Sequence, residues 1–207
     1  MFYNIKVERY IDMGNIVKTK KEFANALFGL LENKNYHDIT INEICAVANK
    51  TKMTFYKYYK DKEALLAEAS IDLINTEYNE DYAKILRKEK DIEEIEYQSL
   101  VATYNWVGKH YNQIANLTYK GETLPLEIFK TALFNNYKAY MSEIVNSGGY
   151  DIPSDYIAVF FFEGLYNSCI YYAQQLKTNK SKKKVKEDSK KICRLLAKIS
   201  MSMMKAM

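Results

Sequence analysis

Lysine and tyrosine side chains are interleaved over a short stretch near the N-terminus of this 207-residue chain. Residues 49–62 contain a single acid, Asp61. The basic and phenolic residues of the stretch are Lys50, Lys52, Lys57, Lys60, Lys62, Tyr56, Tyr58 and Tyr59. Ammonium and phenol groups donate hydrogen bonds to phosphate oxygens. The stretch therefore favours binding of a polyanion such as nucleic acid.

Other reactive residues are isolated in the sequence. His37 and His110 have no cysteine or carboxylate cluster near them, and the three cysteines, Cys45, Cys169 and Cys193, lie far apart. These spacings indicate no catalytic centre, no metal site, no cofactor and no disulfide framework. An enzyme is therefore disfavoured, and unpaired cysteines fit a reducing compartment.

The sequence predicts no membrane association. The longest apolar run, residues 157–162, is far too short to span a bilayer. The N-terminus lacks the apolar region of a signal peptide. We therefore expect a cytoplasmic protein.

Helix breakers are scarce, with 7 glycines and 2 prolines in the whole chain. No segment alternates apolar and polar residues as a strand does, so the fold class predicted is all-α. Residues 1–17 are predicted as an irregular arm or a short helix, and residues 18–33 as an amphipathic helix with Thr19 as N-cap. The later helices are expected over about 62–88, 91–118, 124–146, 154–177 and 185–206.

Two short helices surround the lysine-rich stretch. Residues 40–43 form a capping box that opens the first of them. Three residues, 49–51, then lead to a second short helix, for which Thr51 is the natural N-cap. Two short helices with so brief a connection predict a helix-turn-helix, whose second helix fits the major groove of DNA. Phe55 and Tyr59 are expected in its core.

Residues 18–66 resemble the TetR/AcrR-type transcriptional regulators. The hallmark of that family is an aromatic pair, then a cap, a lysine, a glutamate and leucines, here Tyr56, Tyr59, Asp61, Lys62, Glu63, Leu65 and Leu66. Asn35 and Asn49 stand where the family usually has glycine, and Met53 stands where it has a small residue. Asparagine is the mildest replacement for a glycine in the left-handed conformation.

The resemblance implies an N-terminal three-helix DNA-binding domain over residues 1–62, arm included, and a helical sensor and dimerisation domain over 63–207. Lys52, Met53 and Thr54 would point into the major groove, with Lys52 the best candidate for guanine acceptors. The full DNA-binding set is Thr40, Asn42, Thr51, Lys52, Met53, Thr54, Tyr56, Lys57, Tyr58 and Lys62. Tyr56 and Tyr58 could equally be plain surface tyrosines, but the surrounding motif favours phosphate contact.

Residues 154–177 are apolar almost all round, which predicts a helix buried on all sides, partly by a second subunit. The resemblance implies a homodimer built from this helix and the last one, and Gly164 would permit a close approach. The candidate interface residues are Phe161, Gly164, Leu165, Ser168, Tyr172, Leu196, Ile199 and Met203. A two-fold dimer also suits two DNA half-sites one helical turn apart.

Tyrosine is unusually frequent, at 19 residues. Core packing is the simpler reading for any single one, because the excess is not confined to one region. The resemblance nevertheless implies a pocket for a small-molecule effector in the C-terminal domain. Its candidate lining is Tyr104, Trp106, Tyr111, Phe134, Tyr137 and Tyr166.

The net charge of +4 is unevenly distributed. Residues 1–62 carry 11 Lys/Arg against 7 Asp/Glu, residues 63–176 carry 8 against 17, and residues 177–207 carry 11 against 2. DNA should therefore repel the middle of the chain and attract the N-terminal part. The lysines of residues 180–191 are predicted to form a solvated loop between the last two helices.

The helix-turn-helix motif and the family resemblance together imply a regulator that binds double-stranded operator DNA as a homodimer. The function expected is that of a repressor, released when an unknown effector shifts the helix that begins at Lys62. One alternative is a co-regulator on the same scaffold that acts through a protein partner without an effector.

Overall fold

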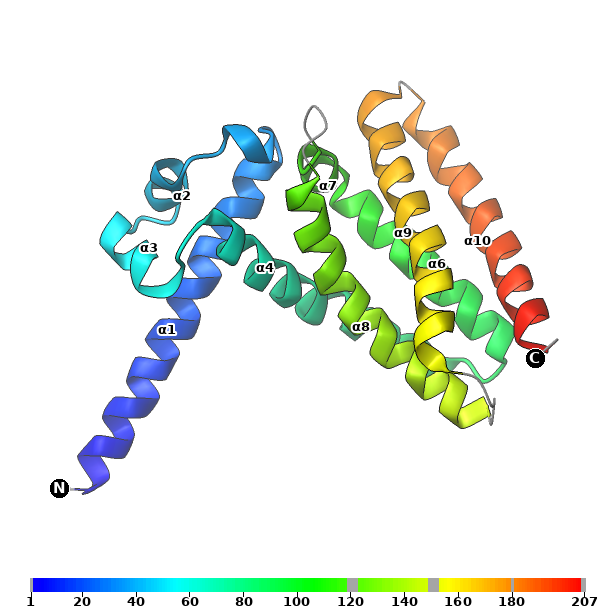
Figure 1. Ribbon diagram of the computed structural model, residues 1–207, viewed down its shortest axis with the longest axis horizontal. Helices are drawn as coiled ribbons and strands as arrows, with labels where there is room; N and C mark the ends of the chain where they lie inside the picture. Colours follow the sequence, from blue (N-terminus) through cyan, green and yellow to red (C-terminus); the bar gives the residue numbers. More distant parts are fainter. Residues whose placement is uncertain (1, 119–122, 149–152, 180, 206–207) are drawn as a thin grey trace. The chain divides into compact units, whose positions relative to one another are not determined.

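The computed structural model describes residues 2–118, 123–148, 153–179 and 181–205. All regular elements in these ranges are helices, which confirms the predicted all-α class (Figure 1). Internal contacts divide the chain into two compact units. Unit 1 comprises Met1–Ala69 and Asn116–Ile128, and unit 2 comprises Ser70–Ala115 and Phe129–Met207. The division thus falls after Ala69, whereas the sequence placed a boundary after residue 62.

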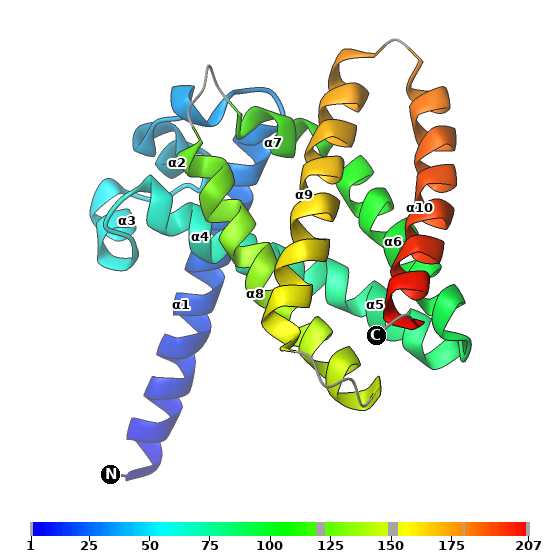
Figure 2. The ribbon, with the colours of Figure 1, turned by 45° about the vertical axis from the view of Figure 1, so that its right-hand side comes forward.

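Unit 1 is built on one long helix, α1 (Phe2–Leu31). The irregular arm or short helix expected over residues 1–17 is instead the first half of this helix, and Thr19 lies inside it, not at a cap. Gly14 is the one glycine in that half, and a helix interior tolerates it at a cost of about 1 kcal/mol relative to alanine. The first turns of α1, drawn in blue, extend beyond the rest of the unit in Figures 1 and 2.

Three short elements and the start of a fourth follow α1 in unit 1. They are η1, a 3-10 turn (Tyr36–Asp38), α2 (Ile41–Val47), α3 (Lys52–Tyr58) and α4 (Lys62–Leu73). Phe23 of α1 meets Phe55 of α3 edge to face, with ring centroids 5.4 Å apart, and Tyr59 at 6.1 Å. All three rings are buried, as expected for Phe55 and Tyr59. The aromatic cluster of Phe23, Phe55 and Tyr59 thus seats α3 on α1.

Unit 2 is a bundle of longer helices. It contains η2 (Ile74–Tyr78), α5 (Asn79–Lys88), α6 (Ile92–Lys109), most of α7 (Tyr111–Asn116), most of α8 (Leu124–Gly148), α9 (Ser154–Thr178) and α10 (Lys182–Lys205). Helix α6 packs against both α9 and α10, and α9 packs against α10 (Figure 2). These three helices form the centre of the unit.

Two of the predicted helices are modified in the structure. The helix predicted over residues 62–88 contains η2, a π-helical stretch where the Thr76 hydroxyl donates to the carbonyl of Asp72 at 2.8 Å. A side chain that bonds back into the ladder in this way disturbs the regular hydrogen bonding of a helix. The helix predicted over 91–118 begins at its expected cap, Asp91, which accepts from Glu94 N at 2.9 Å. It is interrupted at His110, after which α7 begins.

The loop predicted for the lysine-rich segment near the C-terminus is largely helical in the structure. Residues 182–191 form the first turns of α10 and are not the loop predicted from the sequence. Lysine is a good helix former, so a lysine-rich segment continues a helix readily when its charges reach water. The lysines in these turns are all exposed, as a solvated segment requires.

The connection between α2 and α3 contains the only non-glycine residue with a positive φ in the described ranges, Asn49 at 51°. Asn35, the other asparagine at a usual glycine position, has φ −66° and is extended. Asn49→Gly should therefore stabilise unit 1 by about 0.5–1 kcal/mol, because glycine adopts the left-handed conformation without strain. Urea unfolding measures this, and the matched control Asn35→Gly should give no gain. A gain of equal size at Asn35 would contradict the argument.

Candidate nucleic-acid interface

The turn between α2 and α3 is held by main-chain and ionic contacts. Lys50 N donates to the carbonyl of Cys45 at 2.9 Å, which follows from the left-handed conformation of Asn49. The Lys50 ammonium lies 2.8 Å from Glu22 Oε2 of α1, and this contact holds the pKa of Glu22 below its usual range. The turn is therefore tied to α1 as well as to α2.

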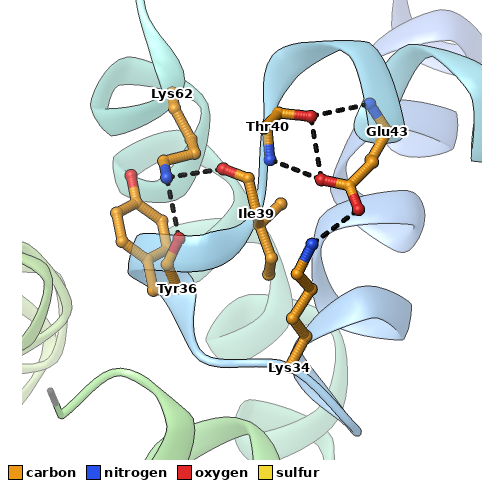
Figure 3. Close-up of polar contacts among 6 residues, drawn as sticks. All are labelled: Lys34, Tyr36, Ile39, Thr40, Glu43 and Lys62. Carbon is orange, nitrogen blue, oxygen red and sulfur yellow. Dashed lines mark hydrogen bonds and ion pairs between the residues drawn. The ribbon is translucent and has the colours of Figure 1, made fainter.

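The start of α2 carries the predicted capping box (Figure 3). Thr40 N donates to Glu43 Oε2 at 2.9 Å, and Glu43 N donates to Thr40 Oγ1 at 3.3 Å. Lys34 donates to the other carboxylate oxygen at 2.6 Å, and this bond, followed by that from Thr40 N, lowers the pKa of Glu43 to about 2. The Thr40 hydroxyl is thus used within the box, whereas the neighbouring Asn42 is exposed.

Helix α3 presents one polar face to solvent above its buried Phe55. Thr51 caps it as predicted, accepting from Thr54 N at 3.1 Å. Met53 is 83% exposed and Tyr56 is 55% exposed. The exposed positions from the N-cap onward are Thr51, Lys52, Met53, Tyr56 and Lys57, and Thr54 and Tyr58 are half-buried. The hydroxyl, ammonium and phenol donors of this set lie on one short helix and its N-cap, an arrangement suited to contact with base edges and phosphates.

Lys62 is placed differently from what the sequence implied. Its ammonium donates to the carbonyls of Tyr36 and Ile39, both at 2.7 Å, and lies 4.1 Å from the centre of the Tyr36 ring (Figure 3). Burial and the nearby Glu63 carboxylate raise the pKa of Tyr36. At least two of the three N–H groups of Lys62 are therefore engaged inside unit 1. We infer that Lys62 positions the helix-turn-helix and does not reach outward to a phosphate.

Unit 2 contains a cavity of about 670 Å³. Of the residues predicted to line a pocket, Trp106, Tyr137 and Tyr166 do so. The other three lie outside its lining: Tyr104 pairs with Ser168, Tyr111 accepts from Lys182 at 2.6 Å, and Phe134 packs on Phe162 at 5.1 Å. Lining residues that sequence reasoning missed include Ile74, Leu100, Phe129 and Leu133. Their apolar character alone does not separate them from ordinary core residues.

The predicted interface residues on α9 and α10 divide into two groups. Gly164 and Ile199 are exposed, and Phe161, Leu165, Leu196 and Met203 are half-buried. Tyr172 is buried inside unit 2, 5.1 Å from the Tyr104 ring, and Ser168 bonds to Tyr104, so these two face inward.

The same two helices expose large apolar side chains that the sequence analysis did not select. Phe160 is 63% exposed, and the others are Tyr156, Val159, Tyr171, Ile192 and Leu195. Helix α9 is therefore not covered on all sides within one chain. An exposed apolar surface of this kind is typical of an interaction site.

His110, Cys169 and Cys193 of unit 2 are engaged or buried within that unit. His110 lies 2.9 Å from Glu77 Oε2 through Nε2 and 3.0 Å from Gln113 Oε1 through Nδ1. Burial raises the pKa of Cys169 to about 12 and that of Cys193 to about 11. Within the part of the chain that the structure describes, no three His, Cys, Asp or Glu residues gather as a metal site would need. No helix in that part is long and apolar enough to cross a membrane.

A family model matches the N-terminal part of this chain. Residues 25–69 match the family model described as "Bacterial regulatory proteins, tetR family". The HTH-type dhaKLM operon transcriptional activator DhaS of Lactococcus lactis subsp. lactis (strain IL1403) is 31% identical over 58 residues, or 28% of this chain. That match spans 31% of DhaS, so less than a third of the relative is represented.

The similarity to solved structures covers most of the chain. A TetR-family transcriptional regulator from Syntrophomonas wolfei str. Goettingen gives a TM-score of 0.66 at 18% identity, covering 86% of this chain and 94% of that one. FadR from Bacillus subtilis, in complex with stearoyl-CoA, gives a TM-score of 0.63 at 14% identity, covering 86% of this chain and 97% of FadR. A TetR transcriptional regulator from Streptococcus agalactiae 2603V gives a TM-score of 0.55 at 23% identity, covering 91% of this chain and 98% of that one.

The two carbonyls held by Lys62 give a stability test. Lys62→Met should destabilise unit 1 by about 1–3 kcal/mol, because both carbonyls lose their donor in a half-buried setting. Lys57→Met removes the same charge from an exposed position and should change stability by less than about 0.5 kcal/mol. Urea unfolding followed by circular dichroism measures both. Equal losses would show that the Lys62 contacts do not hold the unit.

Proposed function

Because this chain belongs to the tetR family of bacterial regulatory proteins, we propose that it is a homodimeric repressor whose operator binding is relieved by a small-molecule effector. The observation that carries the proposal is the polar face of α3, held outward by the buried aromatic cluster beneath it. A helix that presents lysine, threonine and tyrosine from a rigid support suits the major groove.

Each part of that face has a proposed role. Lys52, Met53 and Thr54 lie in the first turn of α3, where a recognition helix reaches base edges, and Lys52 would donate to guanine O6 and N7. Tyr56, Lys57 and Tyr58 follow and would hold phosphates. Lys57 also lies over the Tyr58 ring at 5.5 Å. Thr40, Asn42 and Thr51 would contact the DNA backbone from the two helix starts.

The dimer is proposed from the exposed apolar side chains of α9 and α10. Phe160, Leu195 and Ile199 would be removed from water when a second subunit covers them, which favours association. Gly164 lies on α9, as Phe160 does, and a Cβ atom there would meet nothing within 4 Å in its own chain. The open space at this glycine would let a helix of the partner come close.

The release mechanism is proposed from the continuity of α4. This helix begins at Lys62, which holds unit 1 together, and ends at Leu73, directly before Ile74 of the cavity wall. A ligand that presses on Ile74 would shift α4 and thereby alter the spacing of the two α3 helices. Operator affinity would fall by the difference in ligand affinity between the two states.

A co-regulator that acts through a protein partner is the second candidate. The cavity favours the effector hypothesis, because its volume lies in the range of small-molecule sites, about 300–1,000 Å³. The FadR relative that holds stearoyl-CoA supports a small-molecule effector for this chain as well. The DhaS relative is named an activator, so a reporter gene behind the selected operator should also test the sign of regulation.

Duplexes selected from a random pool should test the DNA contacts. Lys57→Ala should weaken binding to all sequences and reduce the slope of log affinity against log salt by about 1, since it removes one phosphate contact. Lys52→Ala should instead relax the preference at particular base pairs by about 1–3 kcal/mol. Lys183→Ala, a charge-matched change at an exposed position of α10, should alter neither. If Lys52→Ala selects the same sequence as the unmodified protein, the proposed base contact is wrong.

A leucine at position 164 should separate dimerisation from folding. Gly164→Leu should weaken the dimer at least tenfold, because the side chain occupies the space proposed for the partner helix. Analytical ultracentrifugation measures the dissociation constant. Gly29→Leu is the matched control, since a Cβ there also meets nothing within 4 Å and the glycine also lies in a helix. A dimer left intact by Gly164→Leu would place the interface elsewhere.

A further inference from the structure

The cavity of unit 2 has walls that are mainly apolar. Helix α6 contributes Leu100 and Trp106, α8 contributes Phe129 and Leu133, and α9 contributes Phe162. Contact with such walls favours a ligand whose surface is mainly hydrocarbon, because its transfer from water is then favourable.

The charges that line the cavity restrict the chemical class of ligand that it can bind. Among the described residues that line it, Glu96 is the one charged side chain, and no lysine, arginine or histidine contributes. Two lysines of unit 2 are engaged by other carboxylates: Lys130 with Glu163 at 2.8 Å and Lys109 with Glu77 at 2.6 Å. A carboxylate or phosphate on the ligand would be desolvated here without a counter-charge. An anionic ligand is therefore disfavoured.

Trp106 supplies a donor without an acceptor. Its ring stacks on Phe129 with centroids 6.3 Å apart and an interplanar angle of 7°. Within the described residues its Nε1–H is buried and has no hydrogen-bond partner. The neighbouring His110 ring, 5.0 Å away, has both nitrogens within hydrogen-bond distance of Glu77 and Gln113. A buried donor left unpaired costs free energy. A ligand in the cavity would recover it if the indole rotates so that Nε1–H turns from its buried position toward an acceptor on the ligand.

We propose that this cavity binds a neutral, mainly apolar small molecule that carries one hydrogen-bond acceptor, and that the acceptor pairs with Trp106 Nε1–H. The oxygen of a ketone, ester or ether on an otherwise hydrocarbon skeleton is the chemistry required. The regulatory meaning of this ligand rests on the proposed function, but its binding does not.

Three naphthalene probes of similar shape test the proposal on the full-length protein by equilibrium dialysis. They are 2-acetylnaphthalene, which carries a carbonyl acceptor, 2-ethylnaphthalene, which carries none, and 2-naphthoate, which is anionic. The ketone should bind at least tenfold more tightly than either of the others, a difference of about 1.4 kcal/mol. Equal binding of the ketone and the hydrocarbon, tightest binding of the naphthoate, or no saturable binding of any probe would overturn the proposal.

Two variants assign the effect to the indole N–H. Trp106→Phe keeps an aromatic ring and removes the donor, so ketone affinity should fall about tenfold while hydrocarbon affinity stays within about twofold. Leu133→Ala alters an apolar wall residue of α8 and leaves the Trp106–Phe129 stack in place, so it should weaken both probes alike. Circular dichroism checks that each variant is folded. If Trp106→Phe weakens both probes equally, Trp106 contributes packing and not a hydrogen bond, and the proposal is wrong.

A separate measurement tests whether a ligand in the cavity changes DNA binding. DNA affinity is measured with and without 2-acetylnaphthalene at a saturating concentration. Tenfold selectivity for the ketone without any change in DNA affinity would uphold the ligand chemistry and contradict the release mechanism. Loss of DNA binding in the absence of any probe would count against the helix-turn-helix assignment alone.

Discussion

The burial of Phe55 against Phe23 is the contact on which the DNA-facing surface depends. Helix α3 has seven residues, and an isolated helix of that length is not stable in water. It exists because one side chain is enclosed between α1 and Tyr59, with ring centroids 5.4 and 5.6 Å away. Once Phe55 points inward, the helical period of 3.6 residues leaves Met53, Tyr56 and Lys57 directed outward.

Polar contacts at the helix ends then set where α3 lies. The capping box of α2 and the Thr51 cap satisfy main-chain donors that the short helices would otherwise leave unpaired. Lys62 connects the first turn of α4 to the segment that precedes α2, because its ammonium binds two carbonyls there. A lysine in this position joins the recognition unit to the helix proposed to transmit the effector signal. That connection gives a physical reason for a lysine at this position in the motif.

The aromatic residues of unit 2 lie in three different settings. Some, such as Tyr104 and Tyr172, fill the space between α6 and α9 and pair with each other. Trp106 is one of those that form the wall of the cavity, and Tyr156 is one of those exposed on α9. The residue type is the same in all three settings, so composition does not distinguish a core position from a ligand wall or an interface.

Local chemistry explains what could be predicted without the structure. The caps at Thr40, Thr51 and Asp91 depend on neighbours within a few residues, so the sequence determined them. Phe55 and Tyr59 were expected in the core as well, but their partner Phe23 lies far earlier in the chain, on α1. The strain at Asn49 follows from the same local rules.

Other features depend on residues far apart in the chain and were decided by tertiary structure alone. Lys62 binds carbonyls more than twenty residues away, Tyr172 turns inward to meet Tyr104, and Trp106 shares a cavity with Ile74 and Phe162. The lysines of α10 remain helical because their charges reach water while the opposite side of the helix packs on α6 and α9. The type of a side chain indicates whether it can be buried or can donate a hydrogen bond. Which partner it contacts depends on how the helices pack.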